Sequence, residues 1–200
     1  VDAVTPDGSL LAPLERRHAA GFFEGALPRR SAYRLRAANR DGSWTVDDAY
    51  AYGPVLGPLD DWLVGEGTHV KLYDRLGAHP VDHEGSAGVH FAVWAPNALR
   101  VSVVGDFNGW DGRRHAMRKR VGTGVWELFV PALRAGAIYK YEIIGADGTL
   151  LPLKRGQYVL GGAGHAPCLP LVANHLYGPS CVSLDYALAW HGLIPERVHE

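Results

Sequence analysis

The residue types best suited to ligand recognition lie between positions 89 and 144. This stretch combines short alternating segments, the turn Gly-Asp-Phe-Asn-Gly-Trp at 105–110, and aromatic residues placed where they can stay in water. A flat aromatic ring stacks on the apolar C–H face of a sugar, and nearby Asn and Lys side chains hydrogen-bond the sugar hydroxyls. The stretch therefore indicates carbohydrate recognition.

Other residues with chemical potential are less favourably spaced. Asp47–Asp48 and Asp60–Asp61 are adjacent pairs, and neighbours on a strand point to opposite faces, so we expect surface acids rather than a two-carboxylate site. His79 and His83 are four residues apart, but Pro80 disfavours a helix that would align them as metal ligands. We expect no catalytic residue and no metal.

Composition excludes several classes of protein. The chain has 200 residues, 47% of them hydrophobic, and a formal net charge of -1, which gives no electrostatic reason to expect nucleic acid or an anionic membrane as a partner. No apolar run approaches the roughly 20 residues of a spanning helix. Gly65-x-Gly67 lacks the third glycine of a nucleotide-binding loop, so no cofactor is expected.

The cysteines and the start of the sequence bear on location and completeness. Cys168 and Cys181 form neither a disulfide framework nor a Cys-x-x-Cys pair, and a reduced, cytoplasmic compartment fits best. The sequence starts at Val1 and its only methionine is Met117. We therefore expect a fragment or a processed chain.

Alternation of apolar and polar residues predicts a mainly β protein. Residues 32–38 alternate as a half-buried strand, Asn39 to Gly42 forms a turn, and 43–46 returns. Residues 59–63 suit a short helical turn, and the segment 65–80 suits a linker. Strands then recur at short intervals from residue 89 to about 153, which argues for an antiparallel β-sandwich.

Each strand of this predicted sandwich has one inward face. We expect core side chains at these positions: Phe91, Val93, Val101, Val103, Leu128, Tyr141 and Ile143. Trp94 and Trp126 lie in mid-strand and are expected in the core rather than at a ligand. Beyond Arg155 the spacing is helix-like at 170–177 and 183–191, and the glycine run 161–164 provides a break.

Several motifs together resemble one family. They are LAPLERRH at 11–18, GEGTH at 65–69, LGAHP at 76–80, FAVWAPN at 91–97, VSVVGDFNGWD at 101–111 and YKYEI at 139–143. The stretch from 10 to 154 is similar to bacterial 1,4-α-glucan (glycogen) branching enzymes. The resemblance implies two consecutive immunoglobulin-like antiparallel β-sandwiches: an incomplete first one at 1–67, and at 68–154 a family-48 carbohydrate-binding module.

The resemblance also implies binding residues. In relatives that bind glucan, the tryptophan ending the Asn-x-Trp turn and the lysine of the Tyr-Lys motif contact sugar; these are Trp110 and Lys140 here. We expect Asn108 to add a second polar contact. Thr149 and Leu150 stand where a further aromatic often completes the platform, so weak binding is expected. Alternatively, Trp110 packs on a neighbouring domain; the sequence leaves both open.

The last part of the chain departs from this family. After Lys154 the branching-enzyme pattern Ala-Asp-Pro-Tyr is replaced by Arg-Gly-Gln-Tyr-Val-Leu. Residues 153–160 and 176–196 are similar to the AbiEi-type antitoxin or transcriptional regulator family, so 155–200 is predicted to be a foreign, short and partly helical tail. From Arg155 onward the chain has two arginines, no lysine and three acids, which gives no basic footprint for DNA.

These observations favour a non-catalytic glucan-binding and docking region of a branching enzyme. The family's catalytic Asp and Glu lie on a barrel far beyond these residues, so we carry over no catalytic position and expect no activity from this chain alone. The implied partners are α-glucan, bound weakly, and the catalytic barrel of a longer parent. Two alternatives stay open: a protein-interaction scaffold without glucan binding, and a DNA-binding antitoxin or regulator fragment.

Overall fold

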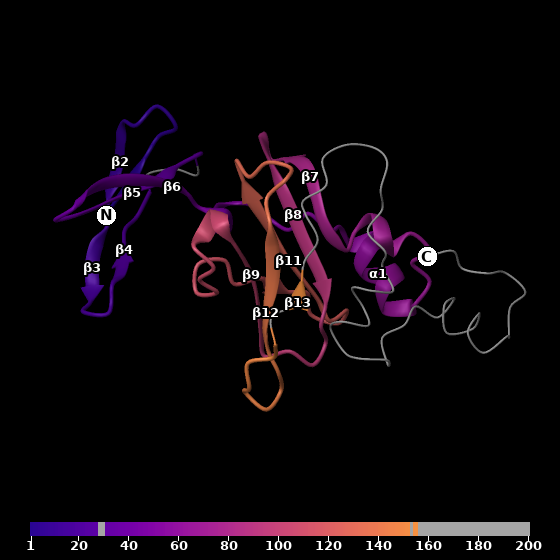
Figure 1. Ribbon diagram of the computed structural model, residues 1–200. Coiled ribbons are helices and arrows are strands. Elements are labelled where there is room, and N and C mark those ends of the chain that lie inside the picture. Colours follow the sequence, from indigo (N-terminus) through magenta and orange to yellow (C-terminus); the bar gives the residue numbers. More distant parts are fainter. Residues whose placement is uncertain (28–30, 153, 156–200) are drawn as a thin grey trace, which may run out of the picture.

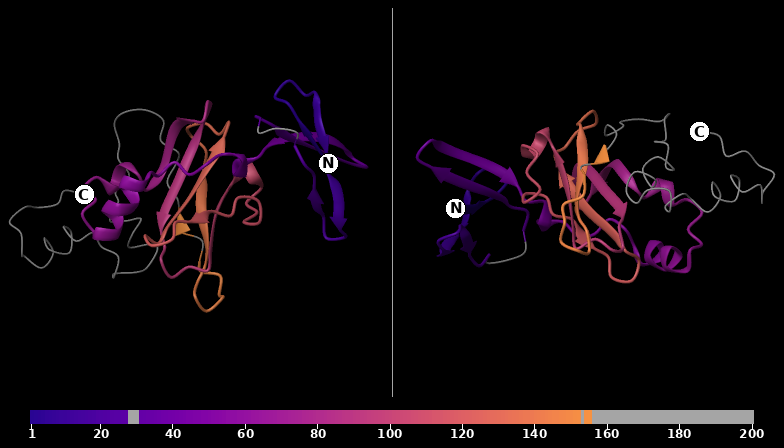
Figure 2. Two further views of the ribbon diagram at one scale, coloured as in Figure 1. Left: turned by 180° about the vertical axis from the view of Figure 1, so that it is seen from behind. Right: turned by 60° about the horizontal axis from the view of Figure 1, so that its bottom comes forward.

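The computed structural model describes residues 1–27, 31–152 and 154–155, and this part of the chain is mainly β (Figure 1). Antiparallel pairing joins every pair of neighbouring strands, which confirms the predicted fold class. The strands form a first unit near the N-terminus and a second, two-layered unit (Figures 1 and 2).

The first unit is an open four-stranded sheet with a hairpin beside it. The sheet has the order β2-β1-β5-β6, and β3 pairs with β4. The strands are β1 (Asp2–Val4), β2 (Leu10–Pro13), β3 (Glu15–His18), β4 (Phe22–Glu24), β5 (Arg34–Asn39) and β6 (Gly42–Asp47). The predicted β5–β6 hairpin is confirmed, and its turn is held by Asn39 Oδ1, which accepts from the backbone N–H groups of Asp41 and Gly42.

A connection of about 30 residues leads from the first unit to the second. It contains the short 3-10 helix η1 (Ala49–Ala51), helix α1 (Pro58–Glu66) and the 3-10 helix η2 (Leu72–Asp74). Helix α1 is longer than the helical turn predicted at 59–63; Pro58 opens it, and Gly67 ends it in the left-handed conformation (φ 72°). Residues 77–80 were expected in a linker, but they lie in strand β7, so that prediction is wrong.

The second unit is a sandwich of two antiparallel sheets. One sheet has the order β10-β11-β8-β7 and the other the order β13-β12-β9. The strands are β7 (Gly77–His83), β8 (Ser86–Trp94), β9 (Arg100–Gly105), β10 (Arg118–Lys119), β11 (Val125–Pro131), β12 (Tyr139–Ile144) and β13 (Lys154–Arg155). The 3-10 helix η3 (Asp106–Asn108) follows β9 directly.

The core lies between these two sheets. All seven predicted core residues are buried, which confirms the period-two assignment: Phe91, Val93, Val101, Val103, Leu128, Tyr141 and Ile143. Trp126 is buried as expected, and its indole N–H donates to Ala95 O. Trp94 was also expected in the core, but it is 41% exposed. Trp94 is the last residue of β8. Alternation along the strand places it on the same face as Ala92 and opposite Phe91, which is the outer face of the sandwich and not the core.

The outer face of the β8–β11 pair is covered by the connection rather than by solvent. Glu127 of β11 is 2% exposed and accepts hydrogen bonds from the backbone N–H groups of Val55 and Leu56. His90 Nε2 and Arg120 also bond to this carboxylate. Burial alone would raise the pKa of Glu127, but the bonds from His90 and the backbone, and the charge of His90, lower it overall. Residues 49–66 thus contact the second sandwich.

Candidate carbohydrate-binding site

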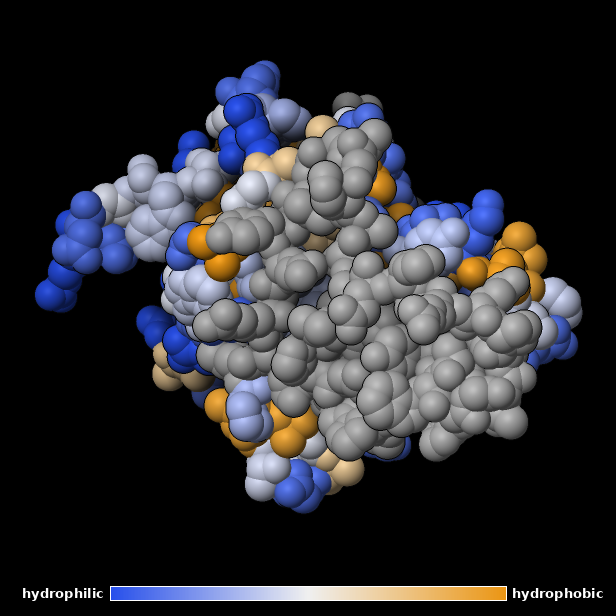
Figure 3. All heavy atoms as spheres, turned by 45° about the vertical axis from the view of Figure 1, so that its right-hand side comes forward, coloured by the Kyte–Doolittle hydropathy of each residue, from blue (hydrophilic) through white to orange (hydrophobic). Residues whose placement is uncertain are grey.

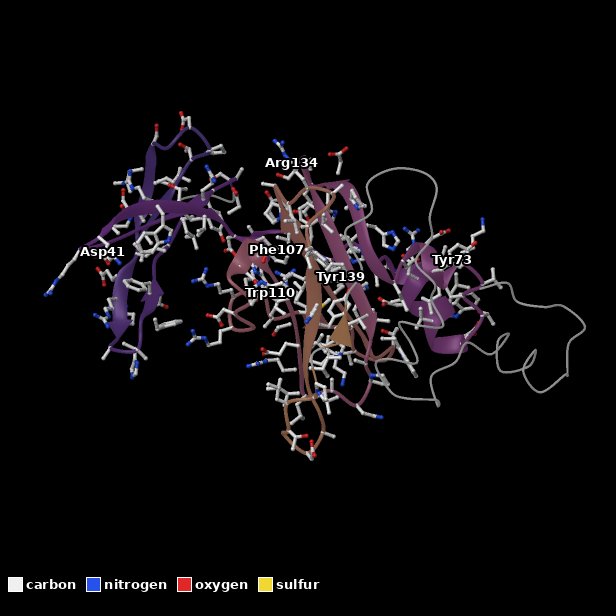
Figure 4. The ribbon with its side chains drawn as sticks, viewed as in Figure 1. Asp41, Tyr73, Phe107, Trp110, Arg134 and Tyr139 are labelled. Carbon is white, nitrogen blue, oxygen red and sulfur yellow. The ribbon has the colours of Figure 1, made fainter. Side chains whose placement is uncertain are left out.

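In the turn after β9, some side chains point into the sandwich and others point into solvent. Phe107 points into the sandwich, where its ring centroid lies 6.1 Å from that of Phe91. Asn108 is buried, whereas Asp106 and Trp110 are exposed, and Trp110 retains 38% of its surface. Phe107 and Asn108 therefore anchor the turn, and Asp106 and Trp110 are its exposed side chains. Figure 4 shows Phe107 and Trp110 in this turn, on the side of the second sandwich nearer the first unit.

The backbone of this turn is held in an uncommon conformation. Trp110 has φ 59°, in the left-handed region that bulky residues rarely adopt. Its N–H donates to Gly105 O at 2.9 Å, and Gly109 N–H donates to Asp106 O at 3.3 Å. Such outliers persist only where surrounding contacts determine them, and they cluster at functional sites. In Trp110 the strained backbone therefore occurs at a residue whose indole ring is exposed and not buried in the core.

Asn108 supports the turn and does not face solvent. Its Oδ1 accepts from Gly105 N–H, and its Nδ2 donates to Val103 O and to His115 Nδ1, each at 2.9 Å. With 2% of its surface exposed, the side chain has no room for a sugar hydroxyl. The structure therefore corrects the expected role of Asn108 from a sugar contact to a support of the turn that carries Trp110.

Lys140 lies where the sequence places it, on the outward side of β12. Strand β12 alternates buried Tyr139, Tyr141 and Ile143 with partly exposed residues, and Lys140 is one of the latter. Its Nζ lies 5.6 Å from the centroid of the Trp110 ring, within the range of a cation–π contact. No hydrogen bond or ion pair to this ammonium occurs among the described residues. The structure thus brings Trp110 and Lys140 together, with the lysine donors unused.

Asp106 joins this pair, although sequence reasoning missed it. Its Oδ1 accepts a hydrogen bond from Trp110 Nε1 at 2.7 Å. A signal for it was present, because the turn sequence places a carboxylate four residues before the tryptophan, on the same exposed side of the turn. An aromatic ring, a cation and a carboxylate therefore meet at one surface.

The hairpin after β12 contributes no aromatic to this surface. Asp147 and Gly148 form the predicted turn, and Asp147 Oδ1 accepts from Thr149 N–H. Thr149 and Leu150, which stand where relatives often carry an aromatic, are both exposed. The site in the described residues thus rests on a single indole, which suits weak binding.

The paired acids and histidines are engaged in structural contacts. Asp47 bonds to Arg34, and Asp48 accepts from Tyr33 Oη at 2.6 Å. Asp60 and Asp61 lie on helix α1 rather than on a strand, and they diverge: Asp60 bonds to His69 and Asp61 to Arg120.

His79 and His83 lie on strand β7 and bond to backbone carbonyl oxygens, those of Leu76 and Gly53. Within the ranges that the structure describes, no group of three or more His, Cys, Asp or Glu side chains is placed to hold a metal ion. No helix of the described residues is long and apolar enough to cross a membrane.

Comparison with known proteins supports the class of this site. Residues 75–158 match the family model of carbohydrate-binding module 48 (isoamylase N-terminal domain). The antiparallel second sandwich agrees with the immunoglobulin-like fold of that module.

Relatives extend the likeness to most of the chain. It is 60% identical over 160 residues to the 1,4-alpha-glucan branching enzyme GlgB of Rhizobium meliloti, covering 79% of this chain and 22% of the relative. With GlgB of Cereibacter sphaeroides it shares 56% identity over 173 residues, covering 86% of this chain and 23% of the relative. The predicted resemblance to bacterial branching enzymes is confirmed, and the chain spans about a quarter of the length of these relatives.

Likeness in three dimensions is weaker. Ligand-free PulA from Klebsiella pneumoniae is 25% identical, with a TM-score of 0.30, over 40% of this chain and 8% of that chain. The predicted resemblance of the segment from residue 155 to AbiEi-type antitoxins stays a prediction, and the helices expected at 170–177 and 183–191 lie outside the described residues.

Proposed function

We propose that this chain is the glucan-binding, non-catalytic region of a 1,4-α-glucan branching enzyme and that it binds α-1,4-linked glucan through Trp110 and Lys140. One observation carries the proposal: an exposed indole, held in a strained turn, lies beside an ammonium group that has no hydrogen-bond acceptor among the described residues. The ring supplies a stacking face, and the ammonium supplies donors for hydroxyls. The match to carbohydrate-binding module 48 and the names of the relatives support glucan as the ligand.

The affinity should be low. One ring and one cation give few contacts, and association must first offset lost translational and rotational freedom. We expect a dissociation constant near the millimolar range, or about -4 kcal/mol. A site of this strength serves to keep a polymer near an enzyme, because a long chain offers many equivalent positions for rebinding.

Affinity electrophoresis in gels containing glycogen tests the proposal. Trp110→Ala should lose retardation, because the stacking face is removed, and Lys140→Ala should reduce it. Trp44→Ala is the matched control: Trp44 is also exposed (49%), but it lies on β6 of the first unit, away from Lys140. Circular dichroism should show all three variants folded. If Trp110→Ala is retarded as strongly as the parent, the platform lies elsewhere and the scaffold alternative gains.

The remaining parts of the proposal concern the longer protein. We infer that this chain docks to the catalytic barrel of a longer parent and that catalysis belongs to that barrel, because the relatives are more than four times as long as the segment that they share with it. A cytoplasmic location and the absence of nucleic-acid binding stay predictions. Incubation with amylose should leave the iodine absorbance unchanged, whereas a reproducible fall from new branches would show that this chain is itself active.

A further inference from the structure

We propose that Asp106 is a positioning and binding residue of the same glucan site, an inference that rests on the proposed function. Its carboxylate holds the Trp110 indole through Oδ1 and offers Oδ2 to a sugar hydroxyl. The starting observation is the 2.7 Å bond from Trp110 Nε1 to Asp106 Oδ1.

The partner of this indole differs from those of other tryptophans in the sandwich. Trp94 and Trp126 donate to backbone carbonyl oxygens, of Thr123 and Ala95 respectively, which are fixed by the fold. Trp110 instead donates to a side-chain carboxylate within its own turn. A charged acceptor makes a shorter and stronger hydrogen bond than a neutral one. The carboxylate therefore fixes the orientation of an indole ring that is partly exposed to solvent and so has fewer packing contacts.

The second carboxylate oxygen is open. Asp106 is exposed, and within the described residues its Oδ2 makes no hydrogen bond or ion pair. It therefore keeps acceptor capacity beside the ring, while the Lys140 ammonium keeps donor capacity over the ring. Sugar hydroxyls both donate and accept, so an acceptor and a donor around one stacking surface suit a pair of hydroxyls on one glucose unit.

The position of Asp106 is itself well determined. The backbone that carries it is fixed by Gly109 N–H, which donates to Asp106 O, and by the buried side chain of Asn108, which bonds to Gly105 N–H. Phe107 anchors the next residue in the core. Pre-organisation of this kind lowers the entropy lost on binding. Asp106 thus supplies the second polar contact that the sequence had assigned to Asn108.

Two substitutions separate positioning from direct contact. Asp106→Ala removes both oxygens, whereas Asp106→Asn keeps one oxygen for the indole and replaces the other by a donor. In the free 200-residue chain, Asp106→Ala should shift the Trp110 indole N–H resonance and speed its exchange with water, and Asp106→Asn should leave both close to the parent. This measurement involves no ligand, so it tests positioning whether or not the proposed function holds.

Titration with maltoheptaose tests the contact. Asp106→Ala should weaken binding about tenfold, because it loses a charge-assisted contact and the fixed ring, and Asp106→Asn should weaken it less, about threefold. Asp41→Ala is the control for a lost surface carboxylate, since Asp41 lies in the β5–β6 turn of the first unit (Figure 4).

The outcomes distinguish the two proposals. If Asp106→Ala leaves the indole resonance and the affinity unchanged while Trp110→Ala abolishes binding, the proposed function stands and the role of Asp106 is refuted. If Asp106→Ala shifts the resonance but not the affinity, Asp106 is only structural and the binding role is refuted. If Trp110→Ala binds like the parent, the proposed function fails, and the glucan role of Asp106 fails with it.

Discussion

In the second sandwich both faces of the β8–β11 pair are covered, whereas in the first unit the edge strand β6 leaves Trp44 and Val46 in solvent. Within the described residues, the buried apolar side chains of β1–β6 are Ala3, Val4 and Ala12, all small. The second sandwich buries aromatic rings in contact, with the Phe91 and Tyr139 centroids 4.9 Å apart. Hydrophobic stabilisation scales with buried apolar area, so stability should reside mainly in the second sandwich.

Trp44 of the first unit and Trp110 of the second sandwich are both exposed, but the packing around them differs. Trp44 is exposed because its sheet is incompletely covered; the first unit also has an open cavity of about 340 Å³, lined by Phe23, Tyr33 and Leu35 among others. Trp110 is exposed although its turn follows a strand of the well-packed second sandwich, and its backbone is held in place by hydrogen bonds. Exposure alone therefore does not distinguish the two tryptophans, and the proposed platform at Trp110 rests on the fixed turn and the unused polar groups beside it. Hydrophobic residues also reach the surface in small separate groups in Figure 3.

The largest expected effect is on the core of the second sandwich. Phe91→Ala should lower the free energy of unfolding by about 3 to 5 kcal/mol, because Phe91 is fully buried and its ring packs on Tyr139 of the other sheet. Leu35→Ala in the first unit should cost about 1 kcal/mol, since Leu35 is only partly buried. Urea unfolding followed by fluorescence measures both; equal losses would remove the contrast between the two units.

Next in size is the buried carboxylate on the outer face. Glu127→Gln should cost about 3 kcal/mol, because it leaves the buried His90 without its charged partner and weakens the bond from Arg120, which keeps only Asp61. Glu15→Gln is the control, because Glu15 is exposed and its pairing with Arg17 lies in solvent. Chemical denaturation compares the two. A cost for Glu127→Gln no larger than the control would mean that the connection is not held by this network.

A smaller loss is expected from the support of the turn. Asn108→Ala should cost about 2 kcal/mol, because Gly105 N–H and Val103 O lose their partners inside the protein. It should also weaken glucan binding, although Asn108 touches no ligand, since the turn that carries Trp110 loosens. Thermal unfolding and maltoheptaose titration measure the two effects. Weakened binding with unchanged stability would instead restore Asn108 as a direct sugar contact.

The smallest effect concerns pH. Burial, followed by the charge of Arg114, lowers the pKa of His115 below its usual 6.5, so the folded state favours the neutral ring. The unfolded state then binds more protons, and stability should fall as the pH drops below about 6.5. His115→Gln should show a smaller fall between pH 7 and pH 5.5 in thermal unfolding. Equal falls in both proteins would exclude His115 as the cause.

Sequence periodicity predicted the second sandwich well, because its inner faces follow a strict alternation. Phe91, Leu128 and Tyr141 were all placed correctly by this rule. The same rule places Trp94 outside, and weighting its size above its face led to the wrong expectation. The burial of Glu127 and Phe129 was not predictable in this way, because a distant segment, residues 49–66, covers the outer face. Strand β7 was missed because Pro80 and two histidines obscure its alternation.

The candidate site was predictable in part. The motif placed Trp110 and Lys140 together, and the structure shows their contact. The roles of Asn108 and Asp106 were not distinguishable from the sequence, because both are short polar residues in one turn and only its backbone geometry decides which one points inward. The residue types thus suggested the kind of site proposed here, whereas the geometry of the turn was needed to show which side chains are exposed in it.

Glucan binding at Trp110 is tested most directly by following the tryptophan indole N–H resonances during a maltoheptaose titration. The chain has six tryptophans, and each indole supplies one resonance assignable by substitution. The resonance of Trp110 should move in a saturable way, while that of Trp44 should stay in place although both rings are exposed. A saturable shift at Trp44 with none at Trp110, or no shift at either up to tens of millimolar ligand, would contradict binding at this turn.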